Sequence, residues 1–444
     1  MRVRGRAVLV LLVASVVTSA CGSGQPTSSP GIPPPSVSAA DPARGELARA
    51  DVARATSTDV TNAELAELVA GNTDFAFDLF RVAAGDGNTL LSPYSVAAAL
   101  AMTYGGARGA TADEMRSVLQ LGLNDERIHA ARNELDLRIT AEPTNPAGGA
   151  GEPLAIRVAN SLWGQAGYPF LEEFLALLAE NYDAGMHLVD YVAAAEQARQ
   201  TINAWVEEQT EGRIVDLIPQ GVITDLTRLV LVNAIWFKAS WATPFDPDRT
   251  RERPFRLLDG DQVSVPLMHG NLRLHYVAGD GYQAVRLPYA GDASMLIVVP
   301  DTGQFEDVVD RLDASTLDAI RRAETEHLVE LSMPTFEFRS QLRLKPALQG
   351  LGMVAAFTDP SQHGGADFTG MTDARELLIH EVIHQAFITV DEEGTKAAAA
   401  TAVIVGRESA SMPATLSIDR PFLFLIEHRA TGELLFIGQV ADPS

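Results

Sequence analysis

Cysteine is almost absent from this chain of 444 residues, which contains only Cys21. A single thiol cannot close a disulfide within the chain, and the folded part that follows it contains no thiolate for a metal or for catalysis. A cysteine nucleophile is therefore excluded. The fold must depend on its apolar core, and a chain of this length can bury a sizeable one.

Basic residues are scarce as well. The sequence has 34 Lys and Arg against 58 Asp and Glu, which gives a formal net charge of −24. Binding to a phosphate backbone needs clustered basic side chains, so we expect no nucleic-acid partner. No Lys/Arg cluster stands out that would favour a polyanionic cofactor, and we expect neither a cofactor nor a metal. The acidity itself favours solubility.

Apolar runs long enough to span a membrane are also missing. The run at residues 7–17 is too short for a permanent span, and three arginines precede it. Small residues and Cys21 follow, which predicts a secretory signal peptide over residues 1–21. This ending resembles the bacterial lipobox, in which the cysteine is acylated, and so it favours lipidation of Cys21. Thr18 is less typical there than Leu, which leaves simple secretion as the alternative. We expect an exported protein, extracellular or in the cell envelope, that contacts a membrane only through this lipid.

Catalytic motifs are largely missing too. We find no G-x-S-x-G elbow and no glycine-rich phosphate loop. Residues 380–384 read H-E-V-I-H and match the zinc-protease pattern, but β-branched and aromatic residues flank them and indicate a strand. His380 and His384 would then lie about 13 Å apart, whereas both ligands of one zinc must come within about 2 Å of it. The sequence therefore favours a protein that is not an enzyme, with a secreted hydrolase as a remote alternative.

The chain divides into three parts by composition. Residues 22–57 are rich in Ser, Pro and Gly and predict a disordered tether. Residues 58–444 read as one domain, with a surface loop at 144–153. Its helical patterns precede its strand patterns, which indicates an α+β fold. We predict helices over 62–83, 95–104, 170–181 and 193–208, and strands over 229–238, 282–287, 294–299, 328–333, 377–390 and 422–427.

The segment after the strand at 377–390 is unusual for a linker. In an extended conformation Thr395, Ala397, Ala399 and Thr401 share one face, which is small and uncharged, while the one charge, Lys396, lies on the other. A segment that must slip into a packed sheet needs such a face, because burying bulk or charge there costs several kcal/mol. Gly394 supplies a hinge with backbone freedom.

Four segments then point to one family. Residues 392–401 (EEGTKAAAAT) resemble the hinge of a serpin reactive-centre loop, and residues 416–426 (LSIDRPFLFLI) resemble the family's C-terminal signature. Residues 233–241 (NAIWFKASW) and 88–115 resemble the strand near the sheet opening and the helix beneath that sheet. The chain therefore resembles a serpin from about residue 60 onward, and with its leader it is similar to a bacterial exported lipoprotein member.

This resemblance implies a serpin fold, in which an N-terminal helical bundle packs on a large mixed β-sheet, with further sheets and a reactive-centre loop at about 392–413. It also implies the roles of individual residues. The implied shutter consists of Ser92, Ser95, Asn233 and His384. The implied hinge consists of Gly394, Thr395, Lys396, Ala397, Ala398, Ala399, Ala400 and Thr401.

The implied function is inhibition of a serine protease by a suicide mechanism. The protease cuts the loop, remains bound as an acyl-enzyme, and is trapped when the loop inserts into the main sheet. The alternative is a serpin that does not inhibit and acts as a binding or carrier module. We expect a monomer.

The position of the cut is left open by the sequence. Arg407 is the basic residue of the loop beyond the hinge, and it favours cleavage at Arg407–Glu408 by a trypsin-like protease. Counting from the hinge by the commonest loop length gives Glu408–Ser409 instead. Cuts among residues 409–411 by an elastase- or subtilisin-like protease are a third possibility.

Overall fold

The computed structural model describes residues 45–141, 155–395 and 413–444. The predicted signal peptide, Cys21, the surface loop at 144–153 and the loop residues 396–412 lie outside these ranges. The described helices are α1 Asn62–Ala83, α2 Pro93–Tyr104, α3 Gly109–Val118, α4 Asp125–Thr140, α5 Glu172–Tyr182, α6 Tyr191–Gln209, α7 Phe305–Arg311, α8 Ala314–Ala323 and α9 Lys345–Gly350. The described strands are β1 Glu46–Ala48, β2 Thr89–Leu91, β3 Ala155–Gln165, β4 Met186–Val189, β5 Leu229–Ser240, β6 Arg251–Arg256, β7 Gln262–Ala278, β8 Tyr282–Pro288, β9 Ala293–Pro300, β10 Thr325–Pro334, β11 Phe336–Arg343, β12 Ile379–Val390, β13 Gly394–Thr395, β14 Ala414–Ser417, β15 Phe422–His428 and β16 Leu434–Val440.

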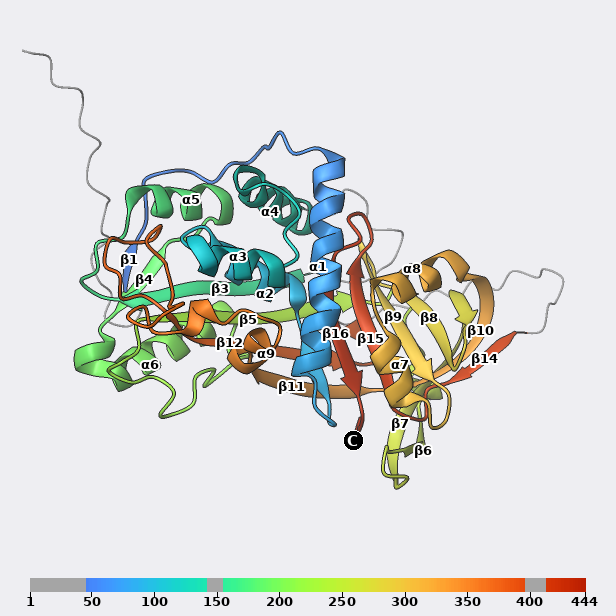
Figure 1. The fold of residues 1–444 in the computed structure, drawn as a ribbon. Coiled ribbons are helices and arrows are strands. Elements are labelled where there is room, and N and C mark those ends of the chain that lie inside the picture. Colours follow the sequence, from blue (N-terminus) through green and yellow to red (C-terminus); the bar gives the residue numbers. More distant parts are fainter. Residues whose placement is uncertain (1–44, 142–154, 396–412) are drawn as a thin grey trace, which may run out of the picture. The chain divides into compact units, whose positions relative to one another are not determined.

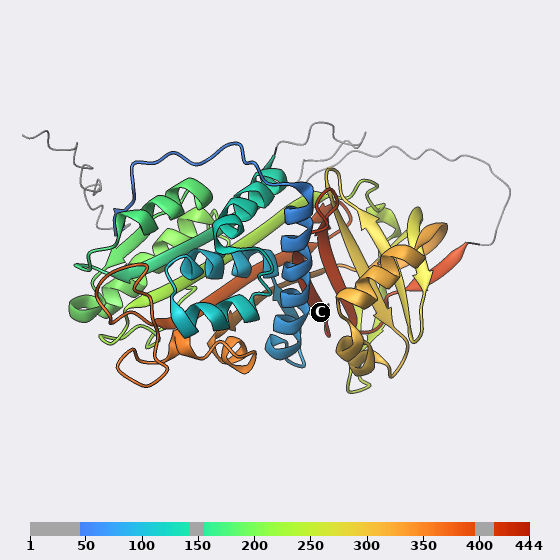
Figure 2. The ribbon, with the colours of Figure 1, turned by 45° about the horizontal axis from the view of Figure 1, so that its top comes forward.

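Two mixed sheets organise the described chain (Figure 1). The seven-stranded sheet has the order β1-β4-β3-β5-β12-β11, and β13 pairs with β5 outside this path. The nine-stranded sheet has the order β14-β10-β7-β8-β9-β15-β16-β2, with β6 on β7. Figure 2 shows α7 and α8 along the nine-stranded sheet, where Arg321 of α8 pairs with Glu427 of β15. The α+β architecture with a large mixed sheet, expected from the sequence, is confirmed.

The N-terminal helices form where the sequence gives them start signals. α1 begins with a capping box, in which the Thr61 side chain accepts from the Glu64 amide and the Glu64 carboxylate accepts from the Thr61 amide. α2 begins after Ser92, whose side chain accepts from the Ser95 amide, and Pro93 occupies its first turn. Both helices were predicted, and they agree with the structure at their C-terminal ends.

The strand β5 separates two parts of the core. Its residues alternate, so that Leu229, Leu231 and Phe237 belong to the main core while Val230 and Val232 belong to a second cluster. Residues of α6, among them Ile202 and Val206, complete that second cluster. α2 contacts β3, β5 and β16 on the main-core side. The side chains of Asn233 and its neighbours on that face therefore point toward α2.

The predicted elements mostly match, with one boundary that differs. Strands were predicted at β5, β8, β9, β10, β12 and β15, and all six are present. The folded chain, however, starts before the predicted domain boundary at residue 58, because β1 pairs with β4 and Ala50 is buried. Composition placed these residues in the tether, since a strand of three residues is too short to produce a pattern. Among the described residues, no helix is both long and apolar enough to cross a membrane.

Candidate functional site: the slot between two central strands

The central feature is the boundary between β5 and β12. The two strands run parallel and are paired from Ile379 with Leu229 to Phe387 with Trp236. Beyond Trp236 this pairing stops, although β5 continues to Ser240 and β12 to Val390. The sheet is therefore closed over most of this boundary and open at one end. We call the boundary the slot, and its open end the mouth.

The chain turns back into this mouth directly after β12. The Asp391 amide donates to the Gly394 carbonyl (2.9 Å) and the Gly394 amide to the Asp391 carbonyl (3.2 Å). Gly394 then pairs with Ser240, and Thr395 with Ala239, in antiparallel register. Because β13 also contacts β12, the first two hinge residues lie between the ends of the two strands.

Gly394 is required by this geometry. Its φ of +135° is a conformation that side chains rarely allow. A Cβ atom there would also lie 2.4 Å from the Ala239 carbonyl oxygen and 2.6 Å from the Trp241 amide nitrogen. The geometry explains why a glycine occupies this position, and its role as a hinge stays a prediction.

Thr395 fills the mouth. It is 1% exposed, and its hydroxyl lies 3.2 Å from the hydroxyl of Tyr289. Its position agrees with the prediction that the small face of the hinge points into the sheet. The remaining hinge residues, Lys396, Ala397, Ala398, Ala399, Ala400 and Thr401, lie outside the described residues.

Two aromatic side chains line the mouth. Trp241 stacks on Tyr289 with ring centroids 4.5 Å apart and an interplanar angle of 7°. The Trp241 indole donates to the Asp391 carbonyl (3.0 Å), and its backbone amide donates to the Glu393 carbonyl (2.9 Å). Sequence reasoning assigned no role to Tyr289, since a tyrosine just after a strand carries no signal of its own. Trp241 appeared in the sequence analysis only as the last residue of the segment 233–241, which resembles the family's strand near the sheet opening.

The predicted shutter residues come together in the closed part of the slot. Ser92, Ser95, Asn233 and His384 are all fully buried. The Ser92 amide donates to His384 Nε2 (3.1 Å), so that nitrogen carries no proton and Nδ1 donates to the Asn233 Oδ1. Asn233 Nδ2 donates to Ser95 Oγ (2.6 Å). The four residues form one chain of hydrogen bonds from α2 across β5 to β12.

Asn160 is a fifth member that sequence reasoning missed. It lies on β3 opposite Asn233, which in turn lies opposite His384 on β12, so the three residues form one row across three strands. Its Oδ1 accepts from Ser95 Oγ (2.9 Å) and from Asn233 Nδ2, and its own amide nitrogen donates to the Ser95 carbonyl (3.0 Å). The sequence signal that could have identified it is a polar asparagine within the strand-like residues 155–165.

Burial controls the charge of the shutter. Desolvation lowers the pKa of the His384 imidazole to about 3, so it is neutral near pH 7. A neutral ring is what its two hydrogen bonds require, because Nε2 must accept while Nδ1 donates. The shutter is therefore an uncharged polar network that bridges the slot.

The zinc-protease pattern lies in this same strand. Residues 380–384 belong to β12, as the flanking residues predicted, and His384 is engaged in the shutter. Among residues 45–141, 155–395 and 413–444, no group of three His, Cys, Asp or Glu side chains is placed to hold a metal. The candidate reactive-bond residues Arg407, Glu408 and Ser409 lie outside those ranges, as does Cys21.

Comparisons with known proteins agree with this geometry. Residues 70–443 match the family described as Serpin (serine protease inhibitor). A serpin-like protein of Thermococcus kodakarensis is 38% identical over 374 residues, which cover 83% of this chain and 84% of that protein. The leukocyte elastase inhibitor of Bos taurus is 36% identical over 390 residues, covering 85% of this chain and all of the inhibitor.

A solved structure gives the same result at the level of the fold. The native state of the thermophilic serpin tengpin superimposes with a TM-score of 0.76 at 27% identity, over 88% of this chain and 97% of tengpin. Together with a family match that covers most of the chain and a slot that already holds the start of the loop, these similarities show that the protein is a member of the serpin family.

Proposed function

We propose that this serpin inhibits serine endopeptidases as a suicide substrate. The observation that carries the proposal is the pairing of Gly394 and Thr395 with Ser240 and Ala239 at the mouth of the slot. The loop therefore begins its path into the sheet in the intact protein. Insertion after cleavage would continue a strand that has already started.

The register supports this path in detail. Because β13 is antiparallel to β5, each step forward along the loop corresponds to one step back along β5. In the same register Thr401 comes opposite Asn233, and Val405 comes opposite Leu229, where β5 begins. The residues that share the face of Thr395 are Ala397, Ala399, Thr401, Val403 and Val405, and none of them is charged. The whole length of the slot can thus be filled without burying a charge on the core side.

The same register bears on the reactive bond. Arg407 and Glu408 come just past the beginning of β5, so a loop cut after either residue is long enough to fill the slot. We favour Arg407–Glu408 and a trypsin-like target, because an arginine fits an acidic specificity pocket. Glu408–Ser409 and an elastase- or subtilisin-like target are the alternatives that the test below distinguishes.

In this mechanism the serine of the protease attacks the loop carbonyl, the peptide bond breaks, and the new amine leaves with residues C-terminal to the cut. The loop then separates β5 from β12, and the hydrogen bond between His384 and Asn233 must break. Thr401 can replace His384 as a partner of Asn233. The protease, still held as an ester, is carried along the sheet.

The decisive experiment incubates the purified protein with trypsin, pancreatic elastase and subtilisin. We expect a complex with trypsin that survives SDS, and mass spectrometry of the released C-terminal peptide should give Glu408 as its first residue. A peptide that begins at Ser409 would assign the reactive bond to Glu408–Ser409, and one that begins later would assign it to residues 409–411. Cleavage without any stable complex, together with no gain in heat stability after the cut, would instead favour a binding or carrier role.

We also propose that the protein is exported and lipidated at Cys21. Support comes from the leader alone, in which arginines, a short apolar run and small residues precede the cysteine. In a bacterial host, labelling with a fatty-acid analogue should mark the wild-type protein. Labelling that persists in Cys21→Ser would contradict lipidation at this residue, and secretion of unlabelled wild type would favour the simple signal peptide.

A further inference from the structure

A pocket of about 570 Å³ lies away from the slot, at a place where three turns meet. Its walls come from the turn between β6 and β7, the segment between β9 and α7, and the turn between β14 and β15. The Arg256 amide donates to the Asp419 carbonyl (2.8 Å), which holds the first and third of these turns together. A volume of this size is typical of pockets for small organic ligands.

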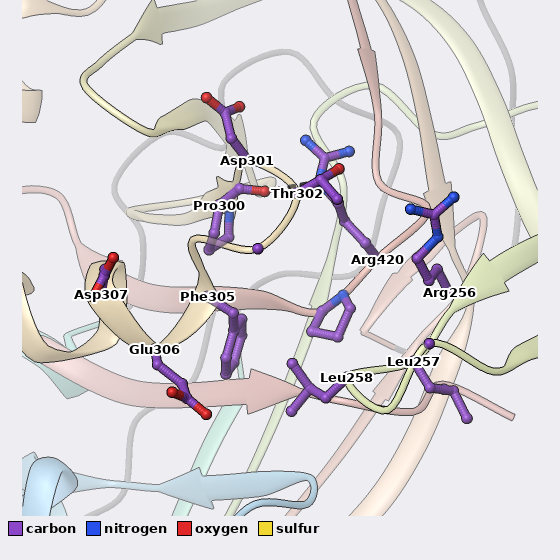
Figure 3. A pocket seen from close by; sticks show the side chains of 13 residues that line it. Arg256, Leu257, Leu258, Pro300, Asp301, Thr302, Phe305, Glu306, Asp307 and Arg420 are labelled. Atoms are coloured by element: carbon purple, nitrogen blue, oxygen red, sulfur yellow. Dashed lines mark hydrogen bonds between the residues drawn. The ribbon is translucent and has the colours of Figure 1, made fainter.

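The lining combines an apolar floor with two cationic groups. Phe305 and Leu258 lie together in the floor, Pro421 also lines the pocket, and Leu258 is 47% exposed, which is high for a leucine. Figure 3 shows the guanidinium groups of Arg256 and Arg420 on the same side of the pocket, with that of Arg420 next to Thr302. Such a site offers contact area to an apolar body and donors to an anionic head.

The side chain of Arg420 is held in place by contacts within the protein. Its Nε donates to the Pro300 carbonyl (2.7 Å) and its Nη1 to the Asp419 carboxylate (3.0 Å), and its side chain is 19% exposed. Arg256, by contrast, is exposed and makes no side-chain hydrogen bond or ion pair with any other described residue. One guanidinium is therefore fixed, and the other is free to close on a ligand.

Acidic residues also belong to the wall, and they lie away from the Arg256 end of the pocket, although Asp301 is drawn near the Arg420 guanidinium. In the view of Figure 3, Asp301 and Asp307 are on the side away from Arg256, and Asp307 points away from the centre of the pocket. Glu306 lies beside the apolar floor, below Phe305. These carboxylates disfavour a large polyanion. They leave room for a compact molecule with a single negative group at the Arg256 end.

We propose that this pocket binds an amphipathic organic acid, with its carboxylate between Arg256 and Arg420 and its apolar part on Phe305, Leu258 and Pro421. The site is separate from the slot and does not depend on the inhibitory mechanism. It is connected to the reactive loop through the chain, because Arg420 lies in the turn directly after β14, the strand that follows the loop in the sequence.

The test is titration calorimetry of the full chain with 2-naphthylacetate and with its neutral amide. We expect saturable binding of the acid at one site and binding of the amide at least about 10-fold weaker, because a charge-assisted contact is lost. Arg256→Gln should lower the affinity for the acid by about 10-fold, and Leu258→Gln should lower it by a few fold. Neither side chain supports a buried contact, so both variants should keep the wild-type circular dichroism.

Arg253→Gln is the matched control, because Arg253 is an exposed arginine of the same strand that does not line the pocket. Its affinity for the acid should equal that of the wild type. The proposal is overturned if the acid does not bind at millimolar concentration, if the amide binds equally well, or if Arg253→Gln weakens binding as much as Arg256→Gln. Inhibition of proteases is measured separately, so a failure here leaves the proposed function untouched.

Discussion

The mouth and the shutter lie along the same slot but are built in opposite ways. At the mouth the β5–β12 pairing has ended, and a small residue from the loop occupies the gap, held by its pairing with Ala239 and by a hydroxyl contact with Tyr289. At the shutter the two strands are paired, and a buried network bridges them through Asn233 and His384. In the proposed mechanism the first region is prepared for insertion of the loop, and the second resists it.

This difference indicates where the barrier to insertion lies. A buried donor or acceptor that loses its partner costs about 1–3 kcal/mol, and the shutter contains several such bonds. The mouth contributes much less, because Thr395 is already in place. Substitutions at the mouth should therefore change whether the cleaved loop inserts. Substitutions at the shutter should change how readily the intact protein inserts its loop without cleavage by a protease.

The largest effect is expected for Thr395→Arg at the mouth. A guanidinium cannot occupy a position that is 1% exposed and beside Tyr289, so the hinge must leave the slot. We expect the variant to be cut as a substrate, with stable complex reduced by about 100-fold or more, since burying the charge costs several kcal/mol. The measurement is densitometry of SDS-stable complex against cleaved protein.

Thr395→Ser is the matched control for this substitution, because it keeps a small side chain with a hydroxyl. It should form complex nearly as well as the wild type. A stable complex with Thr395→Arg at wild-type yield would show that the hinge need not enter the slot at this residue, and the proposed mechanism would then be wrong.

The second prediction concerns Asn233→Ala at the shutter. The change removes the bonds to Ser95 and Asn160 and leaves His384 Nδ1 without its acceptor. We expect the free energy of unfolding of the native form to fall by about 3 kcal/mol. Polymers or loop-inserted monomers should appear on native gels after mild heating.

Asn181→Ala provides the comparison, because Asn181 is a half-buried asparagine on α5 that donates only to the Leu177 carbonyl within its own helix. Its free energy of unfolding, measured by urea denaturation, should fall by less than that of Asn233→Ala, by about 0.5 kcal/mol. Equal shifts for both variants would mean that the shutter has no special role in keeping the slot closed.

The third prediction is a pH dependence that belongs to the shutter. The pKa of His384 is lowered by burial from 6.5 to about 3, so its contribution to stability is complete above pH 6.5 and is lost as the pH falls from 6.5 toward 3. Between pH 6.5 and 5 the loss is about 1.6 kcal/mol. The measurement is the urea midpoint of the native form across this range.

Other buried groups titrate too, so the readout is the difference between wild type and His384→Gln. Burial lowers the pKa of His129 to about 4, which acts in the same direction, and raises that of Glu433 to about 7, which acts in the opposite direction. Both groups are present in the variant and cancel in the difference. An unchanged pH slope in His384→Gln would show that His384 is not responsible.

The sequence predicted the two regions unequally. The shutter set of Ser92, Ser95, Asn233 and His384 came from the family resemblance, while the residue pattern by itself placed only His384, on a strand. Asn160 was missed because its pairing with Asn233 depends on the register of β3 against β5, which residue patterns do not encode. At the mouth, Gly394 and Thr395 could be predicted as a hinge, but their place beside Tyr289 depends on a contact between residues far apart in the chain. The early start of the fold at β1 has the same cause, since a three-residue strand is fixed by its partner β4.

The smallest effect is expected for Tyr289→Phe, which removes one hydroxyl and keeps the ring stacked on Trp241. Losing a single neutral hydrogen bond costs about 1 kcal/mol, so the Thr395 amide should exchange with deuterium about 5-fold faster. The yield of stable complex should stay close to wild type, because Thr395 keeps its pairing with Ala239 on β5. If Tyr289→Phe lowers native stability as much as Asn233→Ala does, the mouth and the shutter do not differ as argued. The barrier to loop insertion would then lie at the mouth. A small effect at Tyr289 beside a large one at Asn233 would place that barrier in the row of side chains that closes the slot.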